Sequence, residues 1–329
     1  MKPEGPREAV NQVAGQDVRK LVDAARNGDP RSVARLISLV ERNAAELAEI
    51  AAAFGADAQR AHVVGLTGSP GVGKSTTTNE LVAAYRRLGK RVGVLAIDPS
   101  SPFTGGAILG DRVRMQDHAT DPGVYIRSMS SRGHLGGLSA ATAAAVRVLA
   151  GVGCDVVLVE TVGVGQAEVE IASLADTTLV LLAPGMGDAI QAVKAGILEI
   201  ADVFVVNKAD REGADATVRD INGMIALGER GAGQWRPRVV KAVAARGEGI
   251  DDVVKAIDEH LHHLEKTGEL RKRREERAAA EIEALVLGRM RARIGSLRGG
   301  HSLGELAAKV AEGVLDPYRA ADELLSGLG

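Results

Sequence analysis

The sequence predicts an α/β fold in which a mostly parallel sheet is flanked by helices. Apolar strand-like runs and helical segments alternate from residue 62 to about 265, the pattern of parallel strands joined by helical crossovers. A glycine-rich segment, 68–75, follows the first run directly. Purely helical patterns lie on both sides of this region. We therefore expect an N-terminal helical extension, a sheet domain and a C-terminal helical arm, over residues 1–56, 57–266 and 267–329.

Seven strands are expected in the sheet domain. Each is a short run rich in Val, Ile, Leu and Ala, as expected for buried strands. Ligands of such sheets bind beyond the carboxyl ends of the strands, where the polar motifs of this chain fall. The expected strands are 62–67, 91–97, 124–128, 155–160, 177–182, 203–207 and 238–243.

Residues 16–54, before the first strand, have apolar positions at helical spacing. Asp29-Pro30 predicts a break between two helices, because Asp is a good N-cap and Pro suits the first helical position. Since this segment precedes the first strand, we expect an appendage rather than a part of the core of the sheet domain.

Composition and charge exclude several classes of protein. Hydrophobic residues make up 45% and charged residues 26%, which is ordinary for a soluble globular chain. The net charge of −2 gives no argument for nucleic acid or an anionic membrane as partner. The single cysteine, Cys154, rules out an intramolecular disulfide and is expected to be a small buried hydrophobe. Without a signal-peptide core or an 18-residue apolar run, we expect a cytoplasmic protein.

Residues 68–75 match the phosphate-binding pattern G-x-x-x-x-G-K-[ST]. A strand precedes the match and a helix, expected from Thr76 to Leu88, follows it, which is the context that this pattern needs. Backbone N–H groups of the loop and the helix N-terminus would surround an anion. Lys74 would reach the β and γ phosphates, and the Ser75 hydroxyl would ligate Mg²⁺. The sequence thus predicts a P-loop NTPase sheet, with a nucleotide-binding loop made of Gly68, Ser69, Pro70, Gly71, Val72, Gly73, Lys74, Ser75 and Thr76.

Acidic residues follow two further strands. Asp98 ends the second strand, and Asp111 lies in the glycine-rich segment after it, so both are candidates to hold Mg²⁺ or its waters. A turn-forming Asp98 and a solvated Asp111 remain open alternatives. Glu160 ends the fourth strand and would meet the metal shell, while the N–H of Gly163 would bond the γ-phosphate and release it after hydrolysis.

Residues 207–210 end the sixth strand and match the guanine-reading pattern N-K-x-D, with Asn207 at its start. Asp210 would accept hydrogen bonds from the ring N–H and the exocyclic amine, a pair of donors that adenine lacks, so GTP is expected over ATP. Lys208 would pack its stem on the base. A backbone loop that touches the guanine oxygen in G proteins falls here on Val243, Ala244 and Ala245, without the usual serine-alanine start.

These motifs together resemble the methylmalonyl-CoA mutase-associated GTPases, the MeaB/ArgK type in the metallochaperone branch (SIMIBI class) of P-loop GTPases. The resemblance runs from about His62 to Ile257. Its signatures are the residues 98–101, Arg127 with 131–133 and 135–137, and 160–166. It implies a GTPase that chaperones a B12-dependent mutase, coupling GTP binding and hydrolysis to adenosylcobalamin loading and protecting the mutase from inactivation.

The resemblance also implies specific roles for residues. Lys194, in an extra switch segment at 187–194, would stabilise charge once the partner is docked. Apolar positions of the C-terminal arm would contact the other subunit of a homodimer. The implied Mg²⁺ shell is Ser75, Asp98, Asp111 and Glu160.

Val164 follows the sensor glycine, where Ras-like proteins have a water-orienting glutamine, so slow intrinsic turnover accelerated by the mutase is expected. Gln166 could position water instead, although a structural role fits its place better.

Two other functions remain open. One is a nucleotide-dependent metal-delivery chaperone using His260, His262 and His263, although adjacent helical histidines point in different directions and favour a solvated face. The other is a P-loop small-molecule kinase linked to arginine transport. The charge run 271–277 is expected on an exposed helical arm rather than in a nucleic-acid site, and Trp235 is expected to serve packing.

Overall fold

The computed structural model describes residues 17–41, 46–99, 116–118, 120–131, 140–161, 167–185, 198–228, 231, 233–296 and 302–327. The chain divides into two compact units, Met1–Arg274 and Glu275–Gly329, and the division falls within one long helix.

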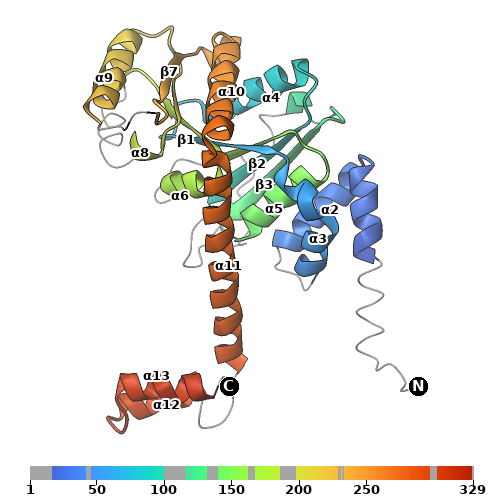
Figure 1. Ribbon diagram of the computed structural model, residues 1–329, viewed down its shortest axis with the longest axis vertical. Helices are drawn as coiled ribbons and strands as arrows, with labels where there is room; N and C mark the ends of the chain where they lie inside the picture. The colour runs from blue at the N-terminus through green and yellow to red at the C-terminus, as the bar shows by residue number, and fades with distance from the viewer. Residues whose placement is uncertain are drawn as a thin grey trace. The chain divides into compact units, whose positions relative to one another are not determined.

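The first unit contains the sheet whose strands β1, β2, β3 and β7 are labelled in Figure 1. The sheet has seven strands in the order β3-β2-β4-β1-β5-β6-β7. Every ladder between neighbouring strands of this sheet is parallel. The predicted α/β fold and its seven strands are therefore confirmed. The strands are β1 (His62–Thr67), β2 (Val92–Pro99), β3 (Val124–Ser131), β4 (Val156–Thr161), β5 (Thr177–Leu182), β6 (Val203–Val206) and β7 (Arg238–Lys241).

Helices connect the strands and cover both faces of the sheet. Before β1 lie a helix over 17–26, α2 (Pro30–Glu41), α3 (Leu47–Phe54) and η1 (Gly55–Gln59). Between β1 and β4 lie α4 (Lys74–Arg87), η2 (Gln116–His118) and α5 (Ala140–Gly151). The remaining helices of this unit are α6 (Ala167–Leu174), α8 (Leu198–Ile200), α9 (Ala214–Leu227), η4 (Ala244–Arg246) and α10 (Ile250–Thr267), and α11 (Glu269–Ser296) begins in it.

Alternation along the strands divides the apolar side chains between the two faces. In β1, Val63 joins a cluster with α2, α3, α5 and α6, whereas Val64 and Leu66 join another with α4 and α10. Phe204 of β6 packs with α9 in a third, smaller cluster. The strands are thus buried on both sides, which explains their continuous apolar sequences.

The helices before β1 belong to the core of the first unit. Leu36, Ile37 and Phe54 share one buried cluster with side chains of β2 and α5. The expectation of an appendage is therefore wrong, because the apolar face of these helices covers the sheet. The predicted cap is confirmed: the Asp29 carboxylate accepts the backbone N–H of Ser32 at 3.0 Å.

The start of α11 is fixed to the amino ends of β5 and β6 by two buried carboxylates. Arg273 donates to both oxygens of Asp202, at 3.1 and 3.2 Å, and Arg274 donates to both oxygens of Asp176, at 2.9 and 3.3 Å. The Asp176 side chain is fully buried. The prediction of a wholly exposed charge run is thus wrong for these two arginines, since their acidic partners come from distant parts of the sequence.

A chain of polar contacts continues from this anchor. The Thr177 hydroxyl lies 2.8 Å from His62 Nε2 and 2.8 Å from His260 Nδ1, and His260 Nε2 lies 3.2 Å from Asp202. Burial lowers the pKa of His62 to about 4, so its imidazole is neutral. His260 is fully buried rather than on a solvated face. Trp235 packs on it with ring centroids 4.9 Å apart, which confirms a packing role.

The second unit comprises α11 from Glu275 onward, α12 (Leu303–Ala311) and α13 (Pro317–Ser326). Ser302 caps α12, and Asp316 caps α13 through the N–H groups of Tyr318 and Arg319. Large apolar side chains are exposed in this unit: Ile282, Leu285, Val286, Leu287, Met290, Leu303, Val314, Tyr318 and Leu325. Over the described parts of both units, no helix is long and apolar enough for a membrane span.

Candidate functional site

The P-loop connects β1 to α4 at the carboxyl edge of the sheet, where the sequence places it. Gly68, Gly71 and Gly73 have φ values of 138°, 80° and 97°, which residues with a side chain rarely adopt. A Cβ on Gly68 would lie 2.3 Å from the carbonyl oxygen of Leu181. Glycine is therefore required both by the backbone of the loop and by its contact with β5.

Lys74 and Ser75 open α4, so the loop leads into a helix N-terminus, where unpaired N–H groups and the helix dipole favour an anion. Lys74 is only 7% exposed, and its ammonium donates to the carbonyl oxygens of Gly68 at 2.6 Å and Ser69 at 3.1 Å. The side chain of Lys74 therefore folds back over residues 68–69, and its ammonium group lies against the P-loop.

The carboxylate of Glu160, at the end of β4, faces the first turns of α4. The Ser75 hydroxyl donates to Glu160 Oε1 at 2.6 Å, and the Thr78 hydroxyl lies 2.9 Å from Glu160 Oε2. Glu160 is only 4% exposed. A hydroxyl and a carboxylate are the oxygen ligands that Mg²⁺ prefers, so these two predicted ligands, Ser75 and Glu160, fit that ion.

The other predicted members of this centre are only partly covered. Asp98 lies in the β2 backbone, two residues beyond Ala96, which pairs with Glu160 across the β2–β4 ladder. The sheet therefore brings the backbones of Asp98 and Glu160 to the same edge. Asp111, Gly163 and Lys194 lie outside the described residues, as do Val164 and Gln166.

Asn207 joins three separate segments of the chain behind the P-loop. Its Nδ2 donates to the carbonyl oxygen of Val72 at 2.8 Å, and its Oδ1 accepts the N–H of Ala244 at 3.0 Å. The side chain is 3% exposed, and a Cβ on Gly73 would lie 2.3 Å from its Nδ2. The end of β6 thus fixes the P-loop and the loop after β7 in one arrangement.

The remaining guanine-motif side chains lie at the open side of this arrangement. Lys208 has a φ of 56°, the only positive value of a non-glycine residue in the described part of the chain, and donates to the Gly71 carbonyl oxygen at 2.6 Å. Asp210 is partly exposed and pairs with Arg246 of η4 at 3.1 Å. Of the loop 243–245, the first two residues are buried and Ala245 is exposed.

Sequence reasoning missed two residues of this site. Thr78 lies three positions after Ser75 and therefore on the same side of α4, a spacing that could have indicated it. Arg246 belongs to the loop whose backbone was expected to contact the base, and only the folded chain places its guanidinium beside Asp210.

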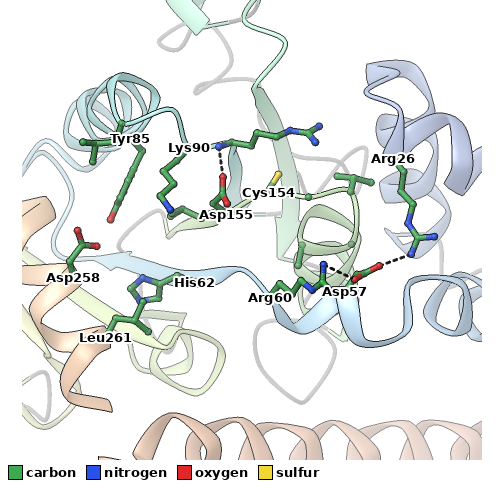
Figure 2. A pocket seen from close by; sticks show the side chains of 17 residues that line it. Arg26, Asp57, Arg60, His62, Tyr85, Lys90, Cys154, Asp155, Asp258 and Leu261 are labelled. Carbon is green, nitrogen blue, oxygen red and sulfur yellow. Dashed lines mark hydrogen bonds and ion pairs between the residues drawn. The ribbon is translucent and has the colours of Figure 1, made fainter. Parts of the chain in front are cut away.

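A separate cavity of about 600 Å³ lies at the amino edge of the sheet (Figure 2). Arg26 and Arg60 lie at 3.0 and 3.1 Å from the shared carboxylate of Asp57, and the backbone N–H of Arg91 donates to Asp155 at 2.8 Å. Among the described residues that line it, none belongs to the predicted nucleotide site. Its acidic and basic groups largely compensate each other.

The histidine cluster does not converge on one point. His260 is buried against Thr177 and Asp202, whereas His262 is exposed. Within the described ranges, no group of three or more His, Cys, Asp or Glu side chains is placed to hold a metal ion.

Comparison with protein families gives a match over most of the chain. A family model described as "Methylmalonyl Co-A mutase-associated GTPase MeaB" matches residues 33–297, a longer segment than the resemblance seen in the motifs alone.

Individual relatives agree with the family model. A putative GTPase of Pyrococcus abyssi is 47% identical over 312 residues, which cover 94% of this chain and 96% of that protein. The mitochondrial methylmalonic aciduria type A homolog of Mus musculus is 37% identical over 80% of this chain and 64% of that protein. GTPase ArgK of Escherichia coli is 39% identical over 65% of this chain and 66% of that protein.

Among solved structures, a crystal structure of a LAO/AO transport system kinase matches with a TM-score of 0.65 and 25% identity. The match covers 94% of this chain and 96% of that one. The fold therefore continues beyond the sheet domain in that structure too.

Proposed function

Since this chain belongs to the family of methylmalonyl-CoA mutase-associated GTPases, we propose that it binds GTP at the carboxyl edge of its sheet and hydrolyses it to GDP and phosphate. The observation that carries the proposal is the bridge made by Asn207, whose two hydrogen bonds join the P-loop to the loop after β7. This bridge supports the proposal that the predicted phosphate-binding loop and the predicted base-reading motif serve one site.

The chain's own groups divide the work on the nucleotide. The P-loop N–H groups and the N-terminus of α4 bind the phosphates, and Lys74 exchanges its carbonyl partners for phosphate oxygens. Ser75 and Glu160, with Asp98 and Asp111 as proposed further members, would hold a Mg²⁺ ion, which would supply positive charge to offset the charge that develops on the phosphates. The N–H of Gly163 would bond the γ-phosphate.

Guanine selectivity would rest on Asp210. Its carboxylate accepts from two base donors that adenine does not present together, and a carboxylate left without them would favour rejection of ATP. Lys208 would pack its stem on the base, and the N–H groups of 243–245 would serve the guanine oxygen.

We further propose that the nucleotide state is read by an adenosylcobalamin-dependent methylmalonyl-CoA mutase. The family description, and the name of the mouse relative, support this partner. Hydrolysis would be slow in the free protein, because Val164 cannot orient water, and faster once the mutase brings Lys194 to the phosphates. GTP binding and turnover would then gate cobalamin loading and protect or reactivate the mutase.

A homodimer and a cytoplasmic location complete the proposal. The exposed apolar side chains along α11, including Ile282, Leu285 and Met290, support a second copy as partner of the arm. A single buried cysteine supports a reducing compartment.

The activity is tested by titrating a fluorescent GDP analogue and by single-turnover hydrolysis of GTP. Lys74→Ala is expected to abolish hydrolysis and weaken binding, whereas Lys90→Ala, at the opposite edge of the sheet, should behave as wild type. GTP uptake and hydrolysis unaffected by Lys74→Ala would refute the site. The partner is tested by co-purification of the mutase in the presence of GDP and, separately, in the presence of a non-hydrolysable GTP analogue. Equal rates of GTP hydrolysis with and without the mutase would contradict the proposed regulation.

A further inference from the structure

We infer that Thr78 is a positioning residue for the Mg²⁺ centre of this site, an inference that rests on the proposed function. Its hydroxyl lies 2.9 Å from Oε2 of Glu160, whereas the Ser75 hydroxyl donates to Oε1. Ser75 and Thr78 of α4 therefore each donate a hydrogen bond to a different oxygen of the Glu160 carboxylate.

The geometry of α4 makes this grip possible. Residues three apart share one side of a helix, so Ser75 and Thr78 both face the end of β4. All three side chains are buried: Thr78 is 0%, Glu160 4% and Ser75 9% exposed. Water therefore has little access to take the place of the threonine hydroxyl.

The hydroxyl of Thr78 has one hydrogen and two acceptors within reach. Besides Glu160, the carbonyl oxygen of Lys74 lies 3.0 Å away. That carbonyl is already served by the backbone N–H four residues later, as in any α-helix. The charged carboxylate makes the stronger hydrogen bond, so the hydrogen belongs to Glu160.

A glutamate side chain has several rotatable bonds, and its use as a ligand requires one orientation. The bond from Thr78 fixes Oε2 and leaves Oε1 directed toward Ser75, the other predicted ligand. The proposed role of Thr78 is therefore not that of a metal ligand. Thr78 acts by holding Glu160 ready for the ion or its waters.

Thr77 provides a matched control in the same helical turn. It is also 0% exposed, and its hydroxyl donates to the Gly73 carbonyl oxygen at 3.0 Å, the ordinary bond of a helical threonine to the preceding turn. Thr77→Val and Thr78→Val remove the same atom and add the same methyl group, but only the second change affects Glu160.

The test measures how Mg²⁺ changes the affinity of the full chain for a fluorescent GDP analogue, a readout that does not depend on hydrolysis. For Thr78→Val, the Mg²⁺ concentration at half-maximal effect should rise at least about tenfold, as for other residues that orient metal ligands. GDP affinity in EDTA should stay within about twofold of wild type, because Thr78 does not belong to the phosphate loop. Thr78→Ser should restore the wild-type Mg²⁺ dependence, and Thr77→Val should leave it unchanged.

Thr78→Ala, which favours the helix, provides a second variant if the valine disturbs folding, and circular dichroism checks each variant. Equal Mg²⁺ dependence in wild type, Thr78→Val and Thr77→Val would overturn the inference while leaving the proposed function intact. Absence of any Mg²⁺ effect in wild type would instead contradict the metal centre of the proposed function.

Discussion

Replacing Asn207 by alanine should both weaken nucleotide binding and lower the stability of the protein, because its side chain joins two loops of the candidate site. The substitution leaves the Val72 carbonyl and the Ala244 N–H without their partner in a buried place. Each such group costs about 1–3 kcal/mol, so the two together cost roughly 3 kcal/mol. This free energy is divided between the unfolding of the protein and the reassembly of the two loops on binding.

Gly71 and Ala245, which adjoin the two bonded residues, are exposed, so we expect at least half of the loss in the binding step. About 1.5 kcal/mol corresponds to a roughly tenfold weaker affinity for GDP, with the remainder visible as a lower melting temperature. The matched control is Asn79→Ala in α4, because Asn79 Oδ1 is buried and accepts no hydrogen bond in the described structure.

Titration of a fluorescent GDP analogue measures the affinity, and thermal unfolding without nucleotide measures the stability. Gly73→Ala offers an independent perturbation of the same contact, since its Cβ would lie 2.3 Å from Asn207 Nδ2, and should also weaken binding. If Asn207→Ala matched Asn79→Ala in both affinity and melting temperature, the bridge would contribute nothing and the reasoning would fail.

Two further predictions concern the amino edge of the sheet. Arg273→Met should lower the free energy of unfolding by about 2 kcal/mol, which is less than for a fully buried ion pair because the Arg273 side chain is 35% exposed. The control is Arg87→Met, in the exposed ion pair with Asp251, which should lower it by under about 0.5 kcal/mol. Burial opposes ionisation of Asp202, but the nearby His260 and the hydrogen bonds from Arg273 outweigh it and lower the pKa of that carboxyl. The ion pair therefore stabilises the folded protein at pH values above the pKa of an unfolded aspartate, about 3.9, and this stabilisation is lost as the pH falls through the lower pKa of folded Asp202. The melting temperatures of wild type and Arg273→Met should consequently converge in acid. Burial raises the pKa of Cys154 to about 12, so the native thiol should resist alkylation at pH 8, as followed by mass spectrometry, and rapid labelling would contradict its burial.

The sheet could be predicted from the sequence because its physical causes are local. Strands buried on both faces require continuous apolar runs, and Asp29-Pro30 carries its own capping chemistry. The P-loop could also be predicted from the sequence, because positions 68 and 73 have positive φ values that favour glycine, and the motif specifies glycine at both positions.

The errors arose where the cause is a partner far away in the chain. Arg273 and Arg274 look like solvated charges until β5 and β6 bring Asp176 and Asp202 to them. The sequence around His260 predicts a residue on a helix surface, but in the folded protein its ring is buried against Thr177 of β5. Local patterns cannot report such partners, because they exist only after the strands are placed.

The same limit applies within the candidate site. Motifs in the sequence predict roles for Ser75 and Glu160, but Thr78 follows the P-loop motif and has no pattern of its own. The role that we propose for Thr78 depends on which oxygen of Glu160 its hydroxyl contacts, and this contact forms only when α4 and β4 are packed together.

Trp235 is the single tryptophan of the chain, so tryptophan fluorescence from this protein has one source. Its indole N–H donates to the backbone oxygen of Asp202 at 2.8 Å, and its ring lies against His260 and His263. The emission spectrum of Trp235 therefore reports, without any attached dye, on the surroundings of Asp202, the residue to which Arg273 of α11 is bound. A spectral change on adding guanine nucleotide would reveal communication from one edge of the sheet to the other.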